Sequence, residues 1–249
     1  MNILKDLTLI TASFNTPIIT KNMLLSFQDL HFGTDILVCE NSNDNETKNI
    51  LKEANINFII SDDKRHSPSI NVLLKAIKTR YALLVDTDII FLRSISDLFD
   101  TFKRENFITM GEVSVDSMRM YEPRIHPCFQ LIDTHFLKQY NIKHFDEKRC
   151  QDRDPLPGIK NYDCGSSFLE DLRSKKAKIG NINGHGYYFY HYGDMSWSHQ
   201  MFDPNILNRN DFNKGSHGFT HIYTNGLKKL EQYMIENKHF SDRKLMKKI

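Results

Sequence analysis

The chain has 249 residues, of which 40% are hydrophobic and 26% charged, a composition typical of a globular protein with a buried core. Its 33 basic and 31 acidic residues give a formal net charge of +2, so no broad basic field favours nucleic acid as a partner. No stretch reaches the roughly 18 consecutive apolar residues of a membrane span, and the four cysteines form no Cys-x-x-Cys pair. We therefore expect a soluble protein in a reducing, cytoplasmic setting.

The first hundred residues alternate between apolar runs and helical patterns. We expect strands at residues 7–13, 35–39, 57–60 and 81–85, and helices at residues 18–30, 46–54 and 67–78. Two helices are expected to begin with a capping residue followed by proline, at Thr16-Pro17 and Ser67-Pro68. Continuous apolar strands joined by helices predict an α/β fold with a mostly parallel central sheet and helices on both faces.

The expected strand ends are rich in side chains that form hydrogen bonds. Open parallel sheets bind ligands at the carboxyl ends of their strands. The candidate ligand-binding residues at these ends are Thr11, Ser13, Asn15, Glu40, Asn41, Ser42, Asp62, Asp63, Asp86 and Thr87. The sequence therefore predicts a ligand site along one edge of the sheet.

Asp86 and Asp88 follow the apolar run at residues 81–85, and apolar residues resume at Ile89. Residues two apart on an extended chain point the same way, and two close carboxylates repel each other unless a cation or a proton lies between them. Carboxylate oxygens suit Mg²⁺ or Mn²⁺, which keep positions open for substrate phosphates. A solvated loop is the alternative, but it is not expected between two buried segments. We therefore predict that Asp86 and Asp88 bind Mn²⁺ or Mg²⁺.

Several segments resemble the GT-A glycosyltransferases, above all their family 2-like group. TLITASFN and ILVCENSND resemble the segments that contact the nucleotide, with Glu40 where aspartate is more usual. Asp62 or Asp63 stands where the family often has an acid that contacts the base or the ribose. SPSINVLLKAIKTRYALLVDTDIIF resembles the helix and strand that lead into the Asp-x-Asp pair, whereas the common Gly-Trp-Gly-x-Glu-Asp form is absent.

Three later segments resemble the acceptor side of the same enzymes, in the same order. They are HPCFQLID, NYDCGSSFLEDLRSKKAKI and YFYHYGDMSW. The resemblance implies that Asp163 is the general base and that His191 is a third metal ligand. A helix N-cap role for Asp163 and a packing role for His191 among aromatic residues stay open, and His185 is a weaker candidate ligand.

The resemblance implies a metal-dependent transfer of a sugar from a UDP- or GDP-sugar to a glycan or a lipid-linked glycan, with inversion expected. The stretch DTDIIFLRSISDLF also resembles retaining GT-A enzymes, so the stereochemistry stays open. A nucleotidyltransferase and a non-catalytic sugar-binding module are alternatives. So is a phosphatase of the haloacid-dehalogenase type, although its Asp-x-Asp pair usually ends the first strand and precedes Gly-Thr.

One domain is expected to span residues 1–249. Residues 1–100 would bind the nucleotide-sugar, residues 101–200 would form the acceptor side with a smaller sheet, and residues 201–249 would form an extension with a C-terminal helix. Residues 150–160 read as a loop, either a lid over the site or an ordinary connection. The extension gathers the basic residues Lys238, Arg243, Lys244, Lys247 and Lys248. These form either a solvated helix end or a weak contact with an anionic membrane surface.

Overall fold

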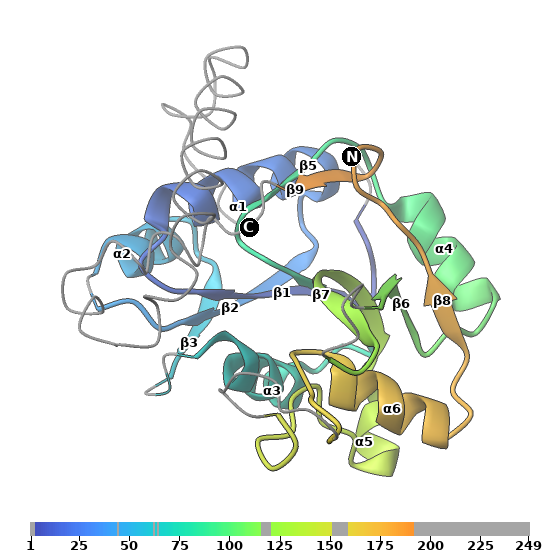
Figure 1. The fold of residues 1–249 in the computed structure, drawn as a ribbon. Coiled ribbons are helices and arrows are strands. Elements are labelled where there is room, and N and C mark those ends of the chain that lie inside the picture. Colours follow the sequence, from blue (N-terminus) through green and yellow to red (C-terminus); the bar gives the residue numbers. More distant parts are fainter. Residues whose placement is uncertain are drawn as a thin grey trace.

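The computed structural model describes residues 3–43, 45–61, 63, 65–115, 121–150 and 159–191 (Figure 1). Its strands are β1 Leu7–Ser13, β2 Asp35–Glu40, β3 Asn57–Ile60, β4 Tyr81–Val85, β5 Ile89–Phe91, β6 Thr109–Ser114, β7 Arg124–Asp133, β8 Ile179–Asn181 and β9 Phe189–His191. Its helices are α1 Pro17–His31, α2 Glu46–Glu53, α3 His66–Ala76, α4 Ser96–Arg104, α5 Thr134–Tyr140 and α6 Ser166–Ser174. The four strands predicted in the first hundred residues are therefore confirmed, with β2 one residue longer than expected.

Seven strands form the central sheet, in the order β3-β2-β1-β4-β7-β6-β8. The strands β3, β2, β1 and β4 are parallel to one another, and β8 is parallel to β6. β7 is antiparallel to both of its neighbours, β4 and β6. Because of this one reversal, the amino end of β7 lies beside the carboxyl end of β4, where the ligand site is expected.

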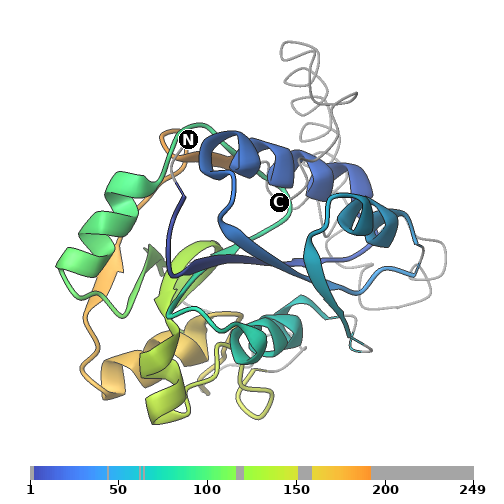
Figure 2. The same ribbon diagram turned by 180° about the vertical axis from the view of Figure 1, so that it is seen from behind.

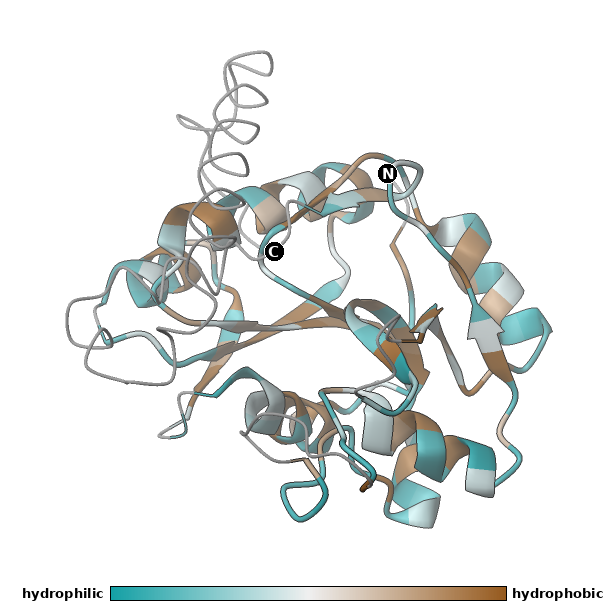
Figure 3. Cartoon of the chain, viewed as in Figure 1, coloured by the Kyte–Doolittle hydropathy of each residue, from teal (hydrophilic) through white to brown (hydrophobic). Residues whose placement is uncertain are grey.

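Helices cover both faces of the sheet, as predicted, and Figures 1 and 2 show them from opposite sides. Along β1, Leu7 and Leu9 pack into one core with residues of α1, α2 and α4. Ile10 and Ala12 of the same strand belong to a second core, with residues of α3, α5 and α6. Successive side chains of a strand point to opposite faces, so an apolar strand supplies both cores at once. Figure 3 shows hydrophobic residues along the central strands, and helices in which hydrophobic and hydrophilic residues alternate.

A second, two-stranded sheet is formed by β5 and β9, which pair antiparallel beside α1 (Figure 1). Ile89 at the start of β5 lies opposite His191 at the end of β9. This pairing places the residue that follows the Asp-x-Asp pair opposite a histidine about a hundred residues further on.

The two predicted helix caps are wrong in detail. The Thr16 side chain does not cap α1, although Pro17 does occupy the first turn as expected. Thr16 Oγ1 lies 3.3 Å from the hydroxyl of Thr20 instead. α3 begins at His66, ahead of the expected start, so Pro68 falls inside its first turn. Proline is tolerated there because the first N–H groups of a helix have no intrahelical partner.

Some predictions lie outside the described residues. These are Asp62, most of the loop at residues 150–160, and the C-terminal extension with its helix and basic residues. Within the described part of the chain, no helix combines the length and the apolar character that crossing a membrane requires.

Candidate functional site

Asp86 and Asp88 lie in the turn that connects β4 to β5. Asp86 follows directly after Val85, and its N–H donates to the carbonyl of Cys128 in β7 at 3.1 Å. Asp88 is buried, with only 2% of its surface exposed. The prediction of an extended chain through these residues is wrong, because Thr87 and Asp88 form a turn. The two carboxylates nevertheless converge.

His191, the last described residue of β9, completes a cluster of three potential ligands. Its Nε2 lies 3.2 Å from Oδ1 of Asp88. One potential ligand atom from each of Asp86, Asp88 and His191 lies within 4.8 Å of the other two. The ring of His185 is exposed and approaches the carbonyl of His191, with Nε2 3.4 Å from that oxygen. The structure therefore brings together the three residues proposed as ligands, and it leaves His185 beside them.

The chemistry of this cluster fits a divalent cation. Two ligands of one Mg²⁺ are about 3 Å apart when adjacent and about 4 Å apart when opposite. Nε2 of His191 is 3.2 Å from Oδ1 of Asp88, and no pair of the three potential ligand atoms is more than 4.8 Å apart. Two carboxylates and an imidazole are also donors that Mn²⁺ and Mg²⁺ accept. The arrangement can therefore hold such an ion with small side-chain movements.

His66 belongs to the site, although it is not among the site residues predicted from the sequence. It is the first residue of α3, and its Nε2 lies 3.1 Å from Oδ1 of Asp86. Its side chain also interacts with that of Cys164, which precedes α6. The sequence did carry a signal for His66. It follows the polar stretch after the third strand, next to the expected start of a helix on the ligand edge.

The electrostatics of the site keep Asp86 ionised. Burial alone would raise the pKa of Asp86, but the contact with His66 and the charges of His66, His191 and His126 lower it below its ordinary value. Burial alone would lower the pKa of His66, but Asp86 and then Cys164 raise it above its ordinary value. Each group stabilises the charged form of the other. Asp86 is therefore present as the carboxylate, the form that binds cations.

Asp163 lies in the segment between residue 159 and α6. Its carboxylate forms an ion pair with Arg124 at the start of β7, and it accepts a hydrogen bond from the N–H of Cys164 at 2.7 Å. The alternative role as the N-cap of α6 is wrong, because Gly165 occupies that position and no side chain caps the helix. Since Cys164 interacts with His66, the segment that carries Asp163 lies beside the cluster.

Hydrogen bonds hold this segment and the start of α6 against the residues just before β7. The N–H of Glu122 donates to the carbonyl of Asn161 at 2.8 Å, and the hydroxyl of Ser166 donates to the carbonyl of Glu122 at 3.0 Å. Gly165 has a φ of 86°, and a Cβ atom at this position would collide with the carbonyl oxygen of Ile125. The close approach of the two segments therefore depends on glycine here.

Solved structures with the same fold were found, although no protein-family model and no curated protein matches the sequence. Mannosyltransferase PcManGT from Pyrobaculum calidifontis, solved in complex with GDP-Man and Mn²⁺, aligns with a TM-score of 0.54 and 8% identity, over 92% of this chain and 75% of that one. Residues 1–349 of S. aureus TarS align with a TM-score of 0.52 and 15% identity, over 93% of this chain and 73% of that one. The longer TarS structure aligns with a TM-score of 0.50 and 17% identity, and the match spans 92% of this chain and 43% of TarS.

The fold is that of the GT-A glycosyltransferases.

In this GT-A fold, the ends of β1 and β2 are tied to each other. The N–H of Asn15 donates to Oγ of Ser42 at 2.8 Å, and Oδ1 of Asn15 accepts from the N–H of Asn43 at 3.0 Å. Nδ2 of Asn41 donates to Oγ of Ser69 in α3 at 2.7 Å. Asn41 and Ser42 are buried, whereas Asn15 is partly exposed. These side chains shape the ligand edge, and their predicted contact with a donor stays a prediction.

Other predicted donor-binding residues lie beneath that edge. Thr11, Ser13, Glu40 and Thr87 are all buried. Oε1 of Glu40 accepts a hydrogen bond from the N–H of Ser42 at 2.6 Å, and burial raises the pKa of Glu40. Oγ of Ser13 lies 2.9 Å from the hydroxyl of Thr20 in α1. A donor contact by any of these side chains also stays a prediction.

Asp63 lies beyond the end of β3, and its carboxylate is hydrogen-bonded by Arg65. The guanidinium donates to both carboxylate oxygens, at 3.0 Å and 2.6 Å, and it also meets Glu147 at 3.2 Å. This hydrogen bonding is the main cause that lowers the pKa of Asp63. Asp63 is therefore an ionised group on the ligand edge of the GT-A fold, already paired with a basic residue.

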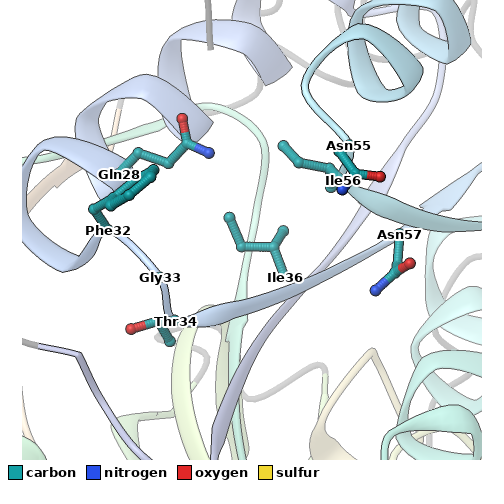
Figure 4. Close-up of a pocket in the computed structure, with 8 residues that line it drawn as sticks. All are labelled: Gln28, Phe32, Gly33, Thr34, Ile36, Asn55, Ile56 and Asn57. Atoms are coloured by element: carbon teal, nitrogen blue, oxygen red, sulfur yellow. The ribbon is translucent and has the colours of Figure 1, made fainter. Parts of the chain in front are cut away.

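A small pocket lies at the other ends of the strands (Figure 4). Its lining comes from the end of α1, the beginning of β2 and the beginning of β3. The lining residues are Gln28, Phe32, Gly33, Thr34, Ile36, Asn55, Ile56 and Asn57. Because ligands of open α/β sheets bind at the carboxyl ends of the strands, this pocket is not part of the candidate site.

Proposed function

We propose that this chain is a metal-dependent glycosyltransferase that moves a sugar from a nucleoside diphosphate sugar to an acceptor hydroxyl. The observation that carries the proposal is the position of the cluster of Asp86, Asp88 and His191. The cluster lies at the carboxyl edge of the parallel strands, in a fold shared with a mannosyltransferase that was solved with GDP-Man and Mn²⁺. A cation cluster at this edge suits a ligand that carries a diphosphate.

In the proposed mechanism, Asp86, Asp88 and His191 hold a divalent cation. When bound, this ion would neutralise the charge that develops on the leaving nucleoside diphosphate, a contribution of several kcal/mol. The sugar in transfer would have oxocarbenium character, as in glycoside cleavage. Nε2 of His66 lies 3.1 Å from Oδ1 of Asp86, and Nε2 of His191 lies 3.2 Å from Oδ1 of Asp88.

Asp163 is proposed as the general base that takes the proton of the acceptor hydroxyl. Its carboxylate meets Arg124 through one oxygen and the N–H of Cys164 through the other. A carboxylate has about four lone-pair sites, so these contacts leave it able to accept a proton. A base on the face opposite the leaving group would give inversion by single displacement, and anomeric analysis of the product separates this outcome from retention.

The donor is proposed to be a UDP- or GDP-sugar, and the acceptor a glycan or a lipid-linked glycan. The GDP-Man complex of the mannosyltransferase supports this class of donor. For a lipid-linked acceptor, the basic residues of 238–248 would add contact with an anionic membrane surface. Sedimentation with vesicles that contain or lack anionic lipid tests this contact, and equal binding to both would contradict it.

The phosphatase alternative is not favoured. Phosphatases of the haloacid-dehalogenase type use the first aspartate of the Asp-x-Asp pair as a nucleophile at the end of the first strand. Here the pair follows β4, and Asp86 is already in contact with His66. A nucleotidyltransferase would release pyrophosphate from a nucleoside triphosphate, so a pyrophosphate assay separates it from the proposed activity.

Thermal unfolding against a panel of nucleotides and nucleotide-sugars, with and without Mn²⁺, tests the proposal. A ligand at about 100 times its Kd stabilises the folded state by about 2.7 kcal/mol. For a chain of this size we expect a rise of roughly 5–10 °C in Tm. The rise should require Mn²⁺, be confined to one nucleoside diphosphate series and disappear in Asp88→Ala. Asp100→Ala, at an exposed position of α4, is the matched control and should keep the full shift. No shift with any nucleotide would contradict the proposal.

A further inference from the structure

We propose that His66 is a positioning residue of the cation site, which holds the carboxylate of Asp86 in the orientation that faces Asp88 and His191. The inference rests on the proposed function, because it concerns how the same site binds its cation. It assigns a role to a side chain that lies outside the group of three potential ligands.

The contact between His66 and Asp86 is short and enclosed. Nε2 of His66 lies 3.1 Å from Oδ1 of Asp86. Both atoms are buried, and among the described residues neither has a partner with regular hydrogen-bond geometry, so their contact is an ion pair. A carboxylate has two oxygens, so an ion pair at Oδ1 leaves acceptor capacity for a cation. The imidazole can therefore orient Asp86 without replacing the metal.

α3 presents His66 from a fixed position. His66 is the first residue of this helix, whose first turns are tied to two other segments. Oγ of Ser69 accepts from Nδ2 of Asn41, at the end of β2, at 2.7 Å. The amide of Asn71 both donates to the carbonyl of Phe145, at 2.7 Å, and accepts from its N–H, at 3.2 Å. The ring of His66 is therefore placed by anchored backbone and not by a mobile loop.

Asp86 needs such support more than Asp88 does. It lies between β4 and the turn, and its side chain is 17% exposed, compared with 2% for Asp88. Asp88 is enclosed and in contact with His191. A carboxylate that can rotate binds a cation less tightly, because the lost rotation opposes binding. Partners that orient a metal ligand typically contribute 10–100-fold to metal affinity.

The test is direct titration of Mn²⁺ into the full chain without nucleotide, with free Mn²⁺ followed by electron paramagnetic resonance. His66→Phe keeps a ring of similar volume but has no N–H, and we expect its Kd for Mn²⁺ to rise about 10-fold or more. His66→Gln keeps a donor near the position of Nε2 and should retain most of the affinity. His135→Phe, the same change at an exposed histidine of α5, should bind like the unsubstituted protein.

The outcomes separate this inference from the proposed function. Mn²⁺ binding that is lost in Asp88→Ala but unchanged or tighter in His66→Phe would overturn the role of His66 alone. No Mn²⁺ binding by the unsubstituted protein would overturn both.

Thermal unfolding of each variant checks its folding. If His66→Phe does not fold, His66→Asn replaces it, because its shorter side chain keeps the amide away from Asp86. Loss of affinity in His66→Asn, with retention in His66→Gln, supports the proposal, and equal affinities contradict it.

Discussion

Two buried aspartates near opposite ends of the same paired strands show how differently one residue type is used. Asp133, at the end of β7, is 4% exposed, and Asp88, beyond the end of β4, is 2% exposed. Oδ2 of Asp133 accepts from the guanidinium of Arg80 at 2.9 Å and 3.1 Å, and Oδ1 accepts from the N–H of His135 at 3.0 Å. Its charge is thus matched by a cation and by the N-terminus of α5.

At the other end, Asp88 lies close to a second carboxylate, that of Asp86, and both are in contact with histidines. Asp133 is a single carboxylate with its own cation, whereas Asp86 and Asp88 bring two carboxylates to one place and only Asp86 is in contact with His66. Burial therefore does not separate a structural aspartate from a functional one. The charges of the neighbouring groups do.

The largest expected effect comes from removing the carboxylate of Asp88, at the metal-site end of the β4–β7 pair. Asp88→Ala should reduce glycosyl transfer at least about 100-fold, because an electrostatic group that acts on the leaving diphosphate is lost. Its free energy of unfolding should change less than that of Asp133→Ala, since removal of one of two close carboxylates relieves repulsion. Initial rates at saturating Mn²⁺ and urea unfolding measure the two quantities. A variant with full activity would contradict the assignment.

Gly165→Ala should damage the segment that carries Asp163. The left-handed backbone and the collision with Ile125 predict a loss of about 1–3 kcal/mol in the free energy of unfolding. Gly186→Ala is the matched control, because Gly186 has a φ of 75° but no atom of the described residues lies within 4 Å of the added methyl group. It should lose only about 1 kcal/mol, the cost of the backbone conformation alone. Equal losses in urea unfolding would show that the close approach to β7 is unimportant.

Asp133→Ala tests the opposite end of the β4–β7 pair with the same substitution as Asp88→Ala. The variant loses a helix cap and buried hydrogen bonds, so we expect its free energy of unfolding to fall by about 1–2 kcal/mol. Because the side chain of Arg80 is half-exposed, its ion pair with Asp133 contributes little to the free energy of unfolding. The Kd for Mn²⁺ should stay unchanged. Weaker Mn²⁺ binding in a folded variant would show that the two ends are not independent.

The smallest expected effect is a pH-dependent gain in stability for Glu40→Gln. Burial raises the pKa of Glu40, so the folded state favours the protonated form. Its contribution to stability is therefore present below the unfolded pKa of about 4.3 and is lost as the pH rises through the higher folded pKa. Glutamine keeps an oxygen for the N–H of Ser42 without the charge. Thermal unfolding should show equal Tm values near pH 4 and a slightly higher Tm for the variant at pH 8, and a lower Tm at pH 8 would contradict this.

The sequence by itself determined the elements whose signal is local. Strands β1 to β4 and their connecting helices follow from hydrophobic runs and helical periodicity, which depend on neighbouring residues. The ligand edge and the Asp-x-Asp pair follow from where those runs end. The cluster with His191 came from a resemblance between segments, since nothing local in YFYHYGD separates a ligand from a packed histidine.

Only the tertiary structure decided the contacts between distant residues. The reversed direction of β7 brings Arg124 and Cys128 to the ligand edge, and the start of α3 brings His66 to Asp86. Such contacts depend on strand order and helix placement, which many distant residues set together through packing. For the same reason the burial of Glu40 and the pairing of Asp163 with Arg124 could not be predicted, because a polar residue at a strand end can face the ligand or the core.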